Sequence, residues 1–124
     1  MRGVRRAVPT EWAFQLERVP PPLLAAGYAR LPDVTAALGV AHSTVSRAAK
    51  GGAYGVVEKI GGCHFARISK VLASERARGE SEMKLAGLVE LARRTREEAI
   101  KTGLVPVEGE FELCTSRKAT PPRA

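Results

Sequence analysis

The chain has 124 residues, enough for one compact domain with short extensions but too few for a large catalytic cleft between domains. Hydrophobic residues make up 44% of it, so a packed core is possible, and no apolar run approaches the ~18 residues of a membrane helix. Lysine and arginine number 20 against 13 acidic residues, which gives a net charge of +7 and favours a polyanion, above all nucleic acid, as partner.

The excess of positive charge lies in the first part of the chain. Residues 1–30 and residues 31–72 each carry five basic and two acidic side chains, whereas residues 73–124 are nearly balanced. Any polyanion is therefore expected to bind the front half. Two cysteines far apart in sequence do not form a disulfide framework, and no apolar run follows the basic N-terminus, so we expect a cytoplasmic, reduced protein that does not enter a membrane.

Residues 1–30 are predicted to form an N-terminal arm or an accessory helix. A short helix over residues 10–18, capped by Thr10, is expected to end at the three prolines that begin at Pro20. Three arginines precede it, and they form either an arm for the minor groove of DNA or a solvated terminus. These arginines are Arg2, Arg5 and Arg6.

Two short helices follow, separated by a turn that contains a glycine. Apolar residues at helical spacing predict a first helix over residues 32–39, which Gly39 ends in a left-handed conformation. The second helix begins with His42 or Ser43 as its cap and runs to Lys50. Two helices joined in this way are typical of a helix-turn-helix.

A β-hairpin is predicted next, with Gly61-Gly62 at its turn. Two β-rich runs, residues 56–60 and residues 63–68, flank this dipeptide, and glycine tolerates the positive φ that a tight hairpin turn requires. Ser69 is expected to cap a further short helix that carries Val71 and Leu72.

The longest predicted helix spans residues 81–102, with an apolar stripe along one side. It has three possible roles: to pack on its own domain, to dimerise or to dock on a partner. We favour self-association, because a single small DNA-binding domain rarely binds a specific site tightly by itself. The stripe consists of Leu85, Leu88, Val89 and Ala92. Residues 103–124 are expected to be a partly disordered tail, with a weak strand pattern over residues 105–113.

The segment Leu31–Lys50 resembles the helix-turn-helix of phage repressors and of the lac-repressor family. Its tetrapeptide Thr44-Val45-Ser46-Arg47 matches one that is common in the recognition helix of the lac family. One departure is Thr35, where that family usually has alanine.

Together with the hairpin and the helix after it, residues 31–73 resemble the winged-helix domains of phage excisionases and MerR-type regulators. Small phage terminase subunits carry a similar domain. The resemblance implies a mainly α fold with a small β-hairpin wing, a winged helix-turn-helix, in which the second helix enters the major groove of DNA.

Eight residues are candidates for DNA contact on this interpretation. Arg47 either grips guanine through O6 and N7 or contacts a phosphate, and the two alternatives are equally compatible with its position. Arg67 either approaches the DNA backbone or pairs with Glu58 across the hairpin. The candidates are His42, Ser43, Thr44, Ser46, Arg47, Lys50, Lys59 and Arg67.

The sequence offers little for catalysis or for a cofactor. Asp33 is the only aspartate, no phosphate-binding glycine loop is present, and Cys63-His64 lacks the spacing of a zinc site. We therefore expect a non-enzymatic protein, without metal or cofactor, that binds double-stranded DNA and forms a homo-oligomer through residues 81–102. The expected role is a regulator or an excisionase-like architectural factor; the alternative is a small terminase-like DNA-packaging subunit.

Overall fold

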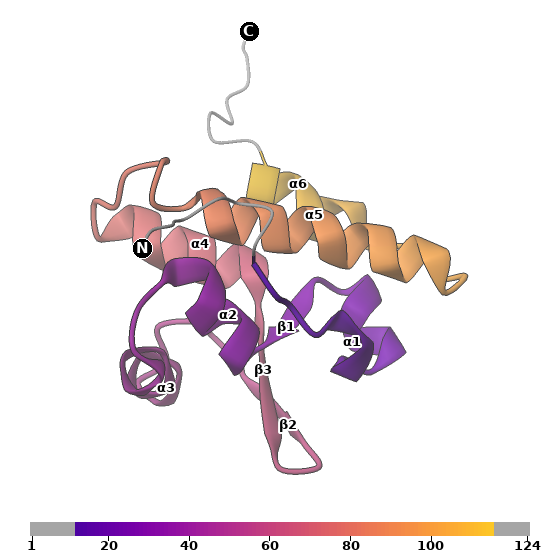
Figure 1. Cartoon of the computed structure of the whole chain (residues 1–124), viewed down its shortest axis with the longest axis horizontal. Helices are drawn as coiled ribbons and strands as arrows, with labels where there is room; N and C mark the ends of the chain where they lie inside the picture. Colours follow the sequence, from indigo (N-terminus) through magenta and orange to yellow (C-terminus); the bar gives the residue numbers. More distant parts are fainter. Residues whose placement is uncertain (1–11, 116–124) are drawn as a thin grey trace, which may run out of the picture.

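The computed structural model describes residues 12–115, which form a small antiparallel sheet with helices around it (Figure 1). The predicted Thr10 cap, the arginine arm and the end of the tail lie outside the described residues. The elements in chain order are a 3-10 turn η2 (Leu16–Arg18), α1 (Pro21–Ala25), β1 (Tyr28–Arg30), α2 (Leu31–Leu38), α3 (His42–Lys50), β2 (Glu58–Ile60), β3 (Cys63–Arg67), α4 (Ile68–Ala77), α5 (Ala86–Lys101) and α6 (Glu108–Thr115). The mainly helical class with a small hairpin is confirmed.

The N-terminal part of the chain is built into the sheet. The predicted helix over residues 10–18 is wrong in its described part, because residues 12–15 are not helical and only the 3-10 turn at Leu16–Arg18 forms before the prolines. Pro21 and Pro22 begin α1, because their fixed φ suits the first helical positions, where no backbone N–H is needed. Strand β1, which the sequence did not predict, pairs with β3, so that the strand order is β1-β3-β2. The third strand widens the support of the hairpin.

Helices α2 and α3 form close to their predicted bounds. Gly39 follows α2 with a φ of 71°, the left-handed conformation expected of a glycine that ends a helix. The fully buried Val34 and Val45 join the two helices in the core, whereas Val40 in the turn is 40% exposed. Ala41 is the N-cap of α3, so neither His42 nor Ser43 caps this helix.

The hairpin also forms as predicted, with Gly61 and Gly62 both at positive φ. It extends away from the layer of α4, α5 and α6, and α3 lies beside it (Figure 1). Ser69 does not cap α4, which begins at Ile68 with Arg67 as its N-cap. The Ser69 hydroxyl instead donates a hydrogen bond to Glu110 Oε1 at 2.7 Å, which links α4 to α6.

Helix α5 packs directly on α2 at Gly87. A Cβ atom built on Gly87 would lie 2.1 Å from the carbonyl oxygen of Ala37, so only glycine permits this approach of the two backbones. Most of the predicted apolar stripe is buried here. Leu85, the N-cap of α5, and Leu88 have no exposed surface and share one core with Val45 of α3, whereas Val89 is half-buried. These side chains complete the core of their own chain, which is the first of the three possible roles; self-association or docking through residues 81–102 stays a prediction.

The end of the chain is helical where a strand was predicted. Phe111 and Cys114, three residues apart, are both buried, so α6 packs on α4 and α5 through one face. Arg96 of α5 pairs with Glu108 at 2.8 Å and holds the start of α6. Within residues 12–115, no helix is long and apolar enough to cross a membrane.

Candidate nucleic-acid interface

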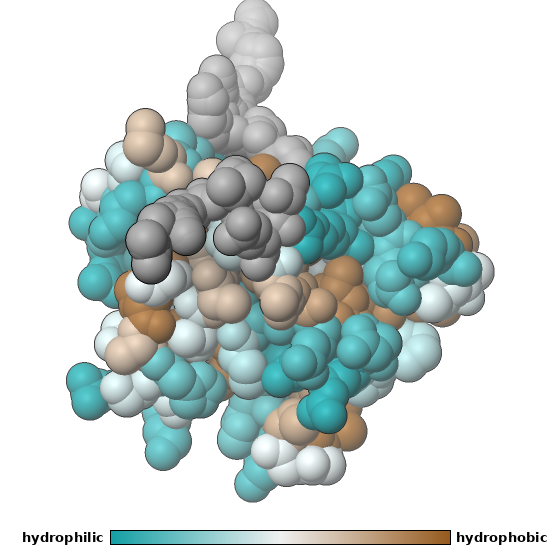
Figure 2. All heavy atoms as spheres, viewed as in Figure 1, coloured by the Kyte–Doolittle hydropathy of each residue, from teal (hydrophilic) through white to brown (hydrophobic). Residues whose placement is uncertain are grey.

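Helix α3 turns one face to the core and leaves the other to solvent. Val45 and Ala49, four residues apart, are the buried positions of this helix, so its remaining faces point outward or lie half-buried. Ser46 is half-buried at the edge of the core. The other five candidates of α3 are exposed: His42, Ser43, Thr44, Arg47 and Lys50. The surface around α3 mixes hydrophilic and apolar residues (Figure 2).

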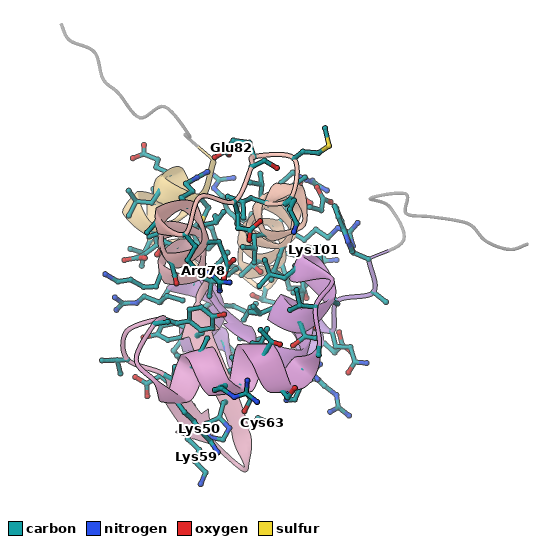
Figure 3. The ribbon with its side chains drawn as sticks, turned by 90° about the vertical axis from the view of Figure 1, so that its left-hand side faces the viewer. Lys50, Lys59, Cys63, Arg78, Glu82 and Lys101 are labelled. Carbon is teal, nitrogen blue, oxygen red and sulfur yellow. The ribbon has the colours of Figure 1, made fainter. Side chains whose placement is uncertain are left out.

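The hairpin brings two further polar side chains next to α3. Lys59 of β2 lies opposite His64 of β3, so both residues stand on the same face of the sheet. Ile60 and Cys63 form the next pair, beside the glycine turn. Figure 3 shows Lys50 and Lys59 extending from the same end of the molecule, near Cys63.

An open groove runs between α3 and the hairpin. One part, of about 290 Å³, is lined by Ser46 and Lys50 from α3 and by Lys59 and His64 from the hairpin. A neighbouring part, of about 170 Å³, shares Ser46 and His64 and reaches His42 at the start of α3. Two elements separated in sequence thus line one continuous groove, in which polar and apolar side chains mix. We call this groove, together with the exposed residues of α3, the α3–hairpin surface.

Three cations of α3 and the hairpin carry no ion pair with any residue that the structure describes. Among residues 12–115, no carboxylate lies within ion-pair distance of Arg47, Lys50 or Lys59. The arginines of α5 differ, because Arg93 and Arg94 both pair with Glu90. These contacts lower the pKa of Glu90 to about 2. Positive charge is therefore free at α3 and the hairpin and neutralised on α5.

Arg67 lies at the end of β3 away from the hairpin turn, and its contacts stabilise the fold. Its guanidinium stands 5.4 Å from the centre of the Tyr28 ring and 4.0 Å from Glu110 of α6. Of the two alternatives for Arg67, the pairing with Glu58 is wrong: Glu58 lies opposite Phe65, and the ion pair of Arg67 is with Glu110. Arg67 is therefore separate from the cations that line the groove.

Thr35 of α2 lies directly behind His42. Its Oγ1 donates a hydrogen bond to the carbonyl oxygen of Leu31 at 2.9 Å and lies 3.2 Å from Nδ1 of His42. In the sequence, Thr35 stands out only as a small residue near the turn and as a departure from the lac-type motif. The one feature of the sequence that could have indicated this contact is the spacing: Thr35 and His42 lie seven residues apart, on either side of a tight turn.

Arg30 also lines the groove and was not among the predicted residues. Its Nη1 donates to Gln15 Oε1 at 3.1 Å and lies 3.7 Å from Asp33 Oδ1. Asp33 is almost fully buried and accepts the backbone N–H of Gln15, and burial raises the pKa of this carboxyl. Arg30 thus connects the groove to the segment before α1, a contact that depends on β1.

No group of three or more possible metal ligands occurs within the described part of the chain. Comparisons of the chain with protein-family models, with curated proteins and with solved structures find no match. The arrangement of charge and shape at the α3–hairpin surface is therefore the basis for assigning a function.

Proposed function

We propose that this chain is a non-enzymatic protein that binds double-stranded DNA through the α3–hairpin surface. The observation that carries the proposal is the set of exposed cations without internal partners on α3 and the hairpin, namely Arg47, Lys50 and Lys59. A polyanion is the partner that such a surface favours, since each contact to a phosphate releases counterions.

The shape of the surface supports duplex DNA over other polyanions. A helix of ordinary diameter fits the major groove, which is about 12 Å wide. Helix α3 is anchored from behind by Val45 and Ala49, so it can enter the groove with His42 and Ser46 near the bases. The hairpin beside it then acts as a wing, with Lys59 close to a neighbouring phosphate.

The order of elements supports a winged helix-turn-helix. The sequence α2, turn, α3, hairpin and α4 follows the order that the resemblance implies. Strand β1 adds to the sheet at the side of β3 away from β2, so it supports the hairpin without covering its outer edge. We propose that the protein acts as a regulator or an excisionase-like architectural factor of DNA.

A packaging subunit of the terminase kind has less support. Such a role requires assembly of many copies, and most of the stripe of α5 that was expected to mediate assembly is buried in the core. Self-association through residues 81–102 remains a proposal, and it would have to use exposed residues such as Met83 and Ile100.

A matched pair of lysines tests the proposal. Lys50 ends α3 and Lys101 ends α5, and both are exposed. The end of α5 lies on the opposite side of the molecule from α3 (Figure 1). Fluorescence anisotropy with a labelled duplex should show weaker binding for Lys50→Ala and unchanged binding for Lys101→Ala. The slope of log K against log salt should fall in magnitude by about 0.9 for Lys50→Ala alone. Equal losses in the two variants would contradict the proposal.

A further inference from the structure

We infer that Thr35 fixes the tautomer of His42, so that the neutral imidazole presents Nε2 as a hydrogen-bond acceptor on the α3–hairpin surface. The tautomer itself is a property of the free protein. The consequence for base recognition rests on the proposed function.

Two contacts of Thr35 Oγ1 share a single hydroxyl proton. The Thr35 hydroxyl has a single hydrogen, and its oxygen lies 2.9 Å from the carbonyl oxygen of Leu31 and 3.2 Å from Nδ1 of His42. A carbonyl oxygen can only accept, so the hydroxyl donates to Leu31. The contact with His42 is then a hydrogen bond only if Nδ1 carries a proton and donates it to Thr35 Oγ1. The opposite tautomer leaves one of the two contacts without a proton.

The location makes the second ring nitrogen accessible. His42 is the first residue of α3, is exposed, and lines the groove together with Ser46 and His64. With Nδ1 directed at α2, Nε2 is the ring nitrogen left to meet a ligand. Alanine, the usual residue of the lac-type motif at position 35, has no hydroxyl with which to hold the ring.

An acceptor at this position selects among bases. In the major groove, adenine and cytosine offer amino donors at N6 and N4, whereas guanine offers only the acceptors N7 and O6. Neutral His42 with a free Nε2 lone pair should therefore favour adenine or cytosine and disfavour guanine. Thr35 is a positioning residue in this scheme, because it acts on DNA only through His42.

The tautomer can be measured without DNA. His42 and His64 are the two histidines of the chain, so their side-chain nitrogens can be assigned in long-range proton–nitrogen NMR spectra at a pH where both rings are neutral. The wild type and Thr35→Ser, which keeps the hydroxyl, should show Nδ1–H at His42. Thr35→Val, which keeps the shape, should shift His42 toward Nε2–H and leave His64 unchanged. A predominant Nε2–H form in the wild type would overturn the inference.

The effect on recognition follows from a selection of bound duplexes out of random sequence. The wild type and Thr35→Ser should prefer adenine or cytosine at one position, by on the order of fivefold for a single hydrogen bond. Thr35→Val should lose that preference while its thermal unfolding stays cooperative; if it does not fold, Thr35→Ala takes its place. An unchanged preference would overturn the role of Thr35 in recognition. Absence of any duplex binding would refute the proposed function and the base preference, while the NMR spectra still decide the tautomer.

Discussion

In the proposed complex with DNA, Arg47 of α3 either reads a base or contacts a phosphate. Its planar guanidinium can donate two hydrogen bonds to guanine, which is worth about 1–3 kcal/mol of discrimination, whereas the ammonium of Lys59 acts as a point charge. Both side chains are exposed and lack an internal ion pair in the part of the chain that the structure describes.

We therefore predict different losses for these two side chains. Arg47→Ala should relax the preference at one step of the selected site, and Lys59→Ala should weaken specific and random duplexes alike. Competition binding with both kinds of duplex measures the difference. Equal losses on specific and random DNA for Arg47→Ala would assign this arginine to a phosphate.

Gly87 carries a second prediction at the level of a single residue. A methyl group at Gly87 would collide with the backbone of Ala37, so Gly87→Ala should destabilise the fold by at least about 1–3 kcal/mol. Gly109 is the matched control, because it also lies in a helix and a Cβ there meets nothing within 4 Å.

Urea denaturation separates the two glycine variants. Gly109→Ala should leave the free energy of unfolding unchanged or raise it by up to about 1 kcal/mol, since alanine favours helix over glycine. If both variants gave the same free energy of unfolding as the wild type, the contact of α5 with α2 would be misplaced.

The two cysteines provide chemical reporters of two different regions. Cys63 is free and exposed beside the hairpin turn, whereas Cys114 is buried in α6, and burial raises the pKa of its thiol to about 12. Under native conditions iodoacetamide should modify Cys63 rapidly and Cys114 only after unfolding, because the thiolate is the reactive form. A saturating duplex should slow the modification of Cys63. Rapid modification of both thiols in the native protein would contradict the docking of α6.

At the scale of elements, short-range patterns in the sequence predicted some parts of the fold and missed others. The glycine after α2, the helical spacing of Val34, Ala37 and Leu38 and the Gly61-Gly62 turn are short-range patterns, and each predicted element formed close to its expected place. Strand β1 has three residues and gains its stability from β3, which lies more than thirty residues away, so no local pattern announces it.

Helix α6 shows how a local pattern misleads. Its sequence Glu110-Phe111-Glu112-Leu113 alternates polar and apolar residues, which predicted a strand. The structure buries Phe111 and Cys114 and leaves Leu113 61% exposed, which is a helical spacing. Tertiary contacts with α4 and α5 decide the outcome here. The candidate site shows the same difference. The exposed positions of α3 could be predicted from the helical pattern of the sequence, whereas the places of Arg30 and His64 at the groove depend on how the strands pair in the sheet.

At the scale of the whole molecule, the C-terminal helices and the helix of the candidate interface pack around the same hydrophobic core. Val45 of α3, Leu88 of α5 and Phe111 of α6 belong to one buried cluster. Removal of residues 81–124 should therefore unfold the remaining chain, because it removes the partners of α2 and α4. Circular dichroism of residues 1–80 should show loss of the cooperative thermal transition. A truncated chain that unfolds cooperatively at the temperature of the full chain would contradict this shared core.

The central claim is that α3 and the hairpin together form the surface that binds duplex DNA. The most direct measurement is an NMR titration of the full chain, labelled with ¹⁵N, with a short duplex at low salt. The account predicts that amide shifts change for residues 42–50 and residues 58–64 and stay in place for residues 90–101. Changes centred on α5 and α6, or no change at any duplex concentration, would contradict it.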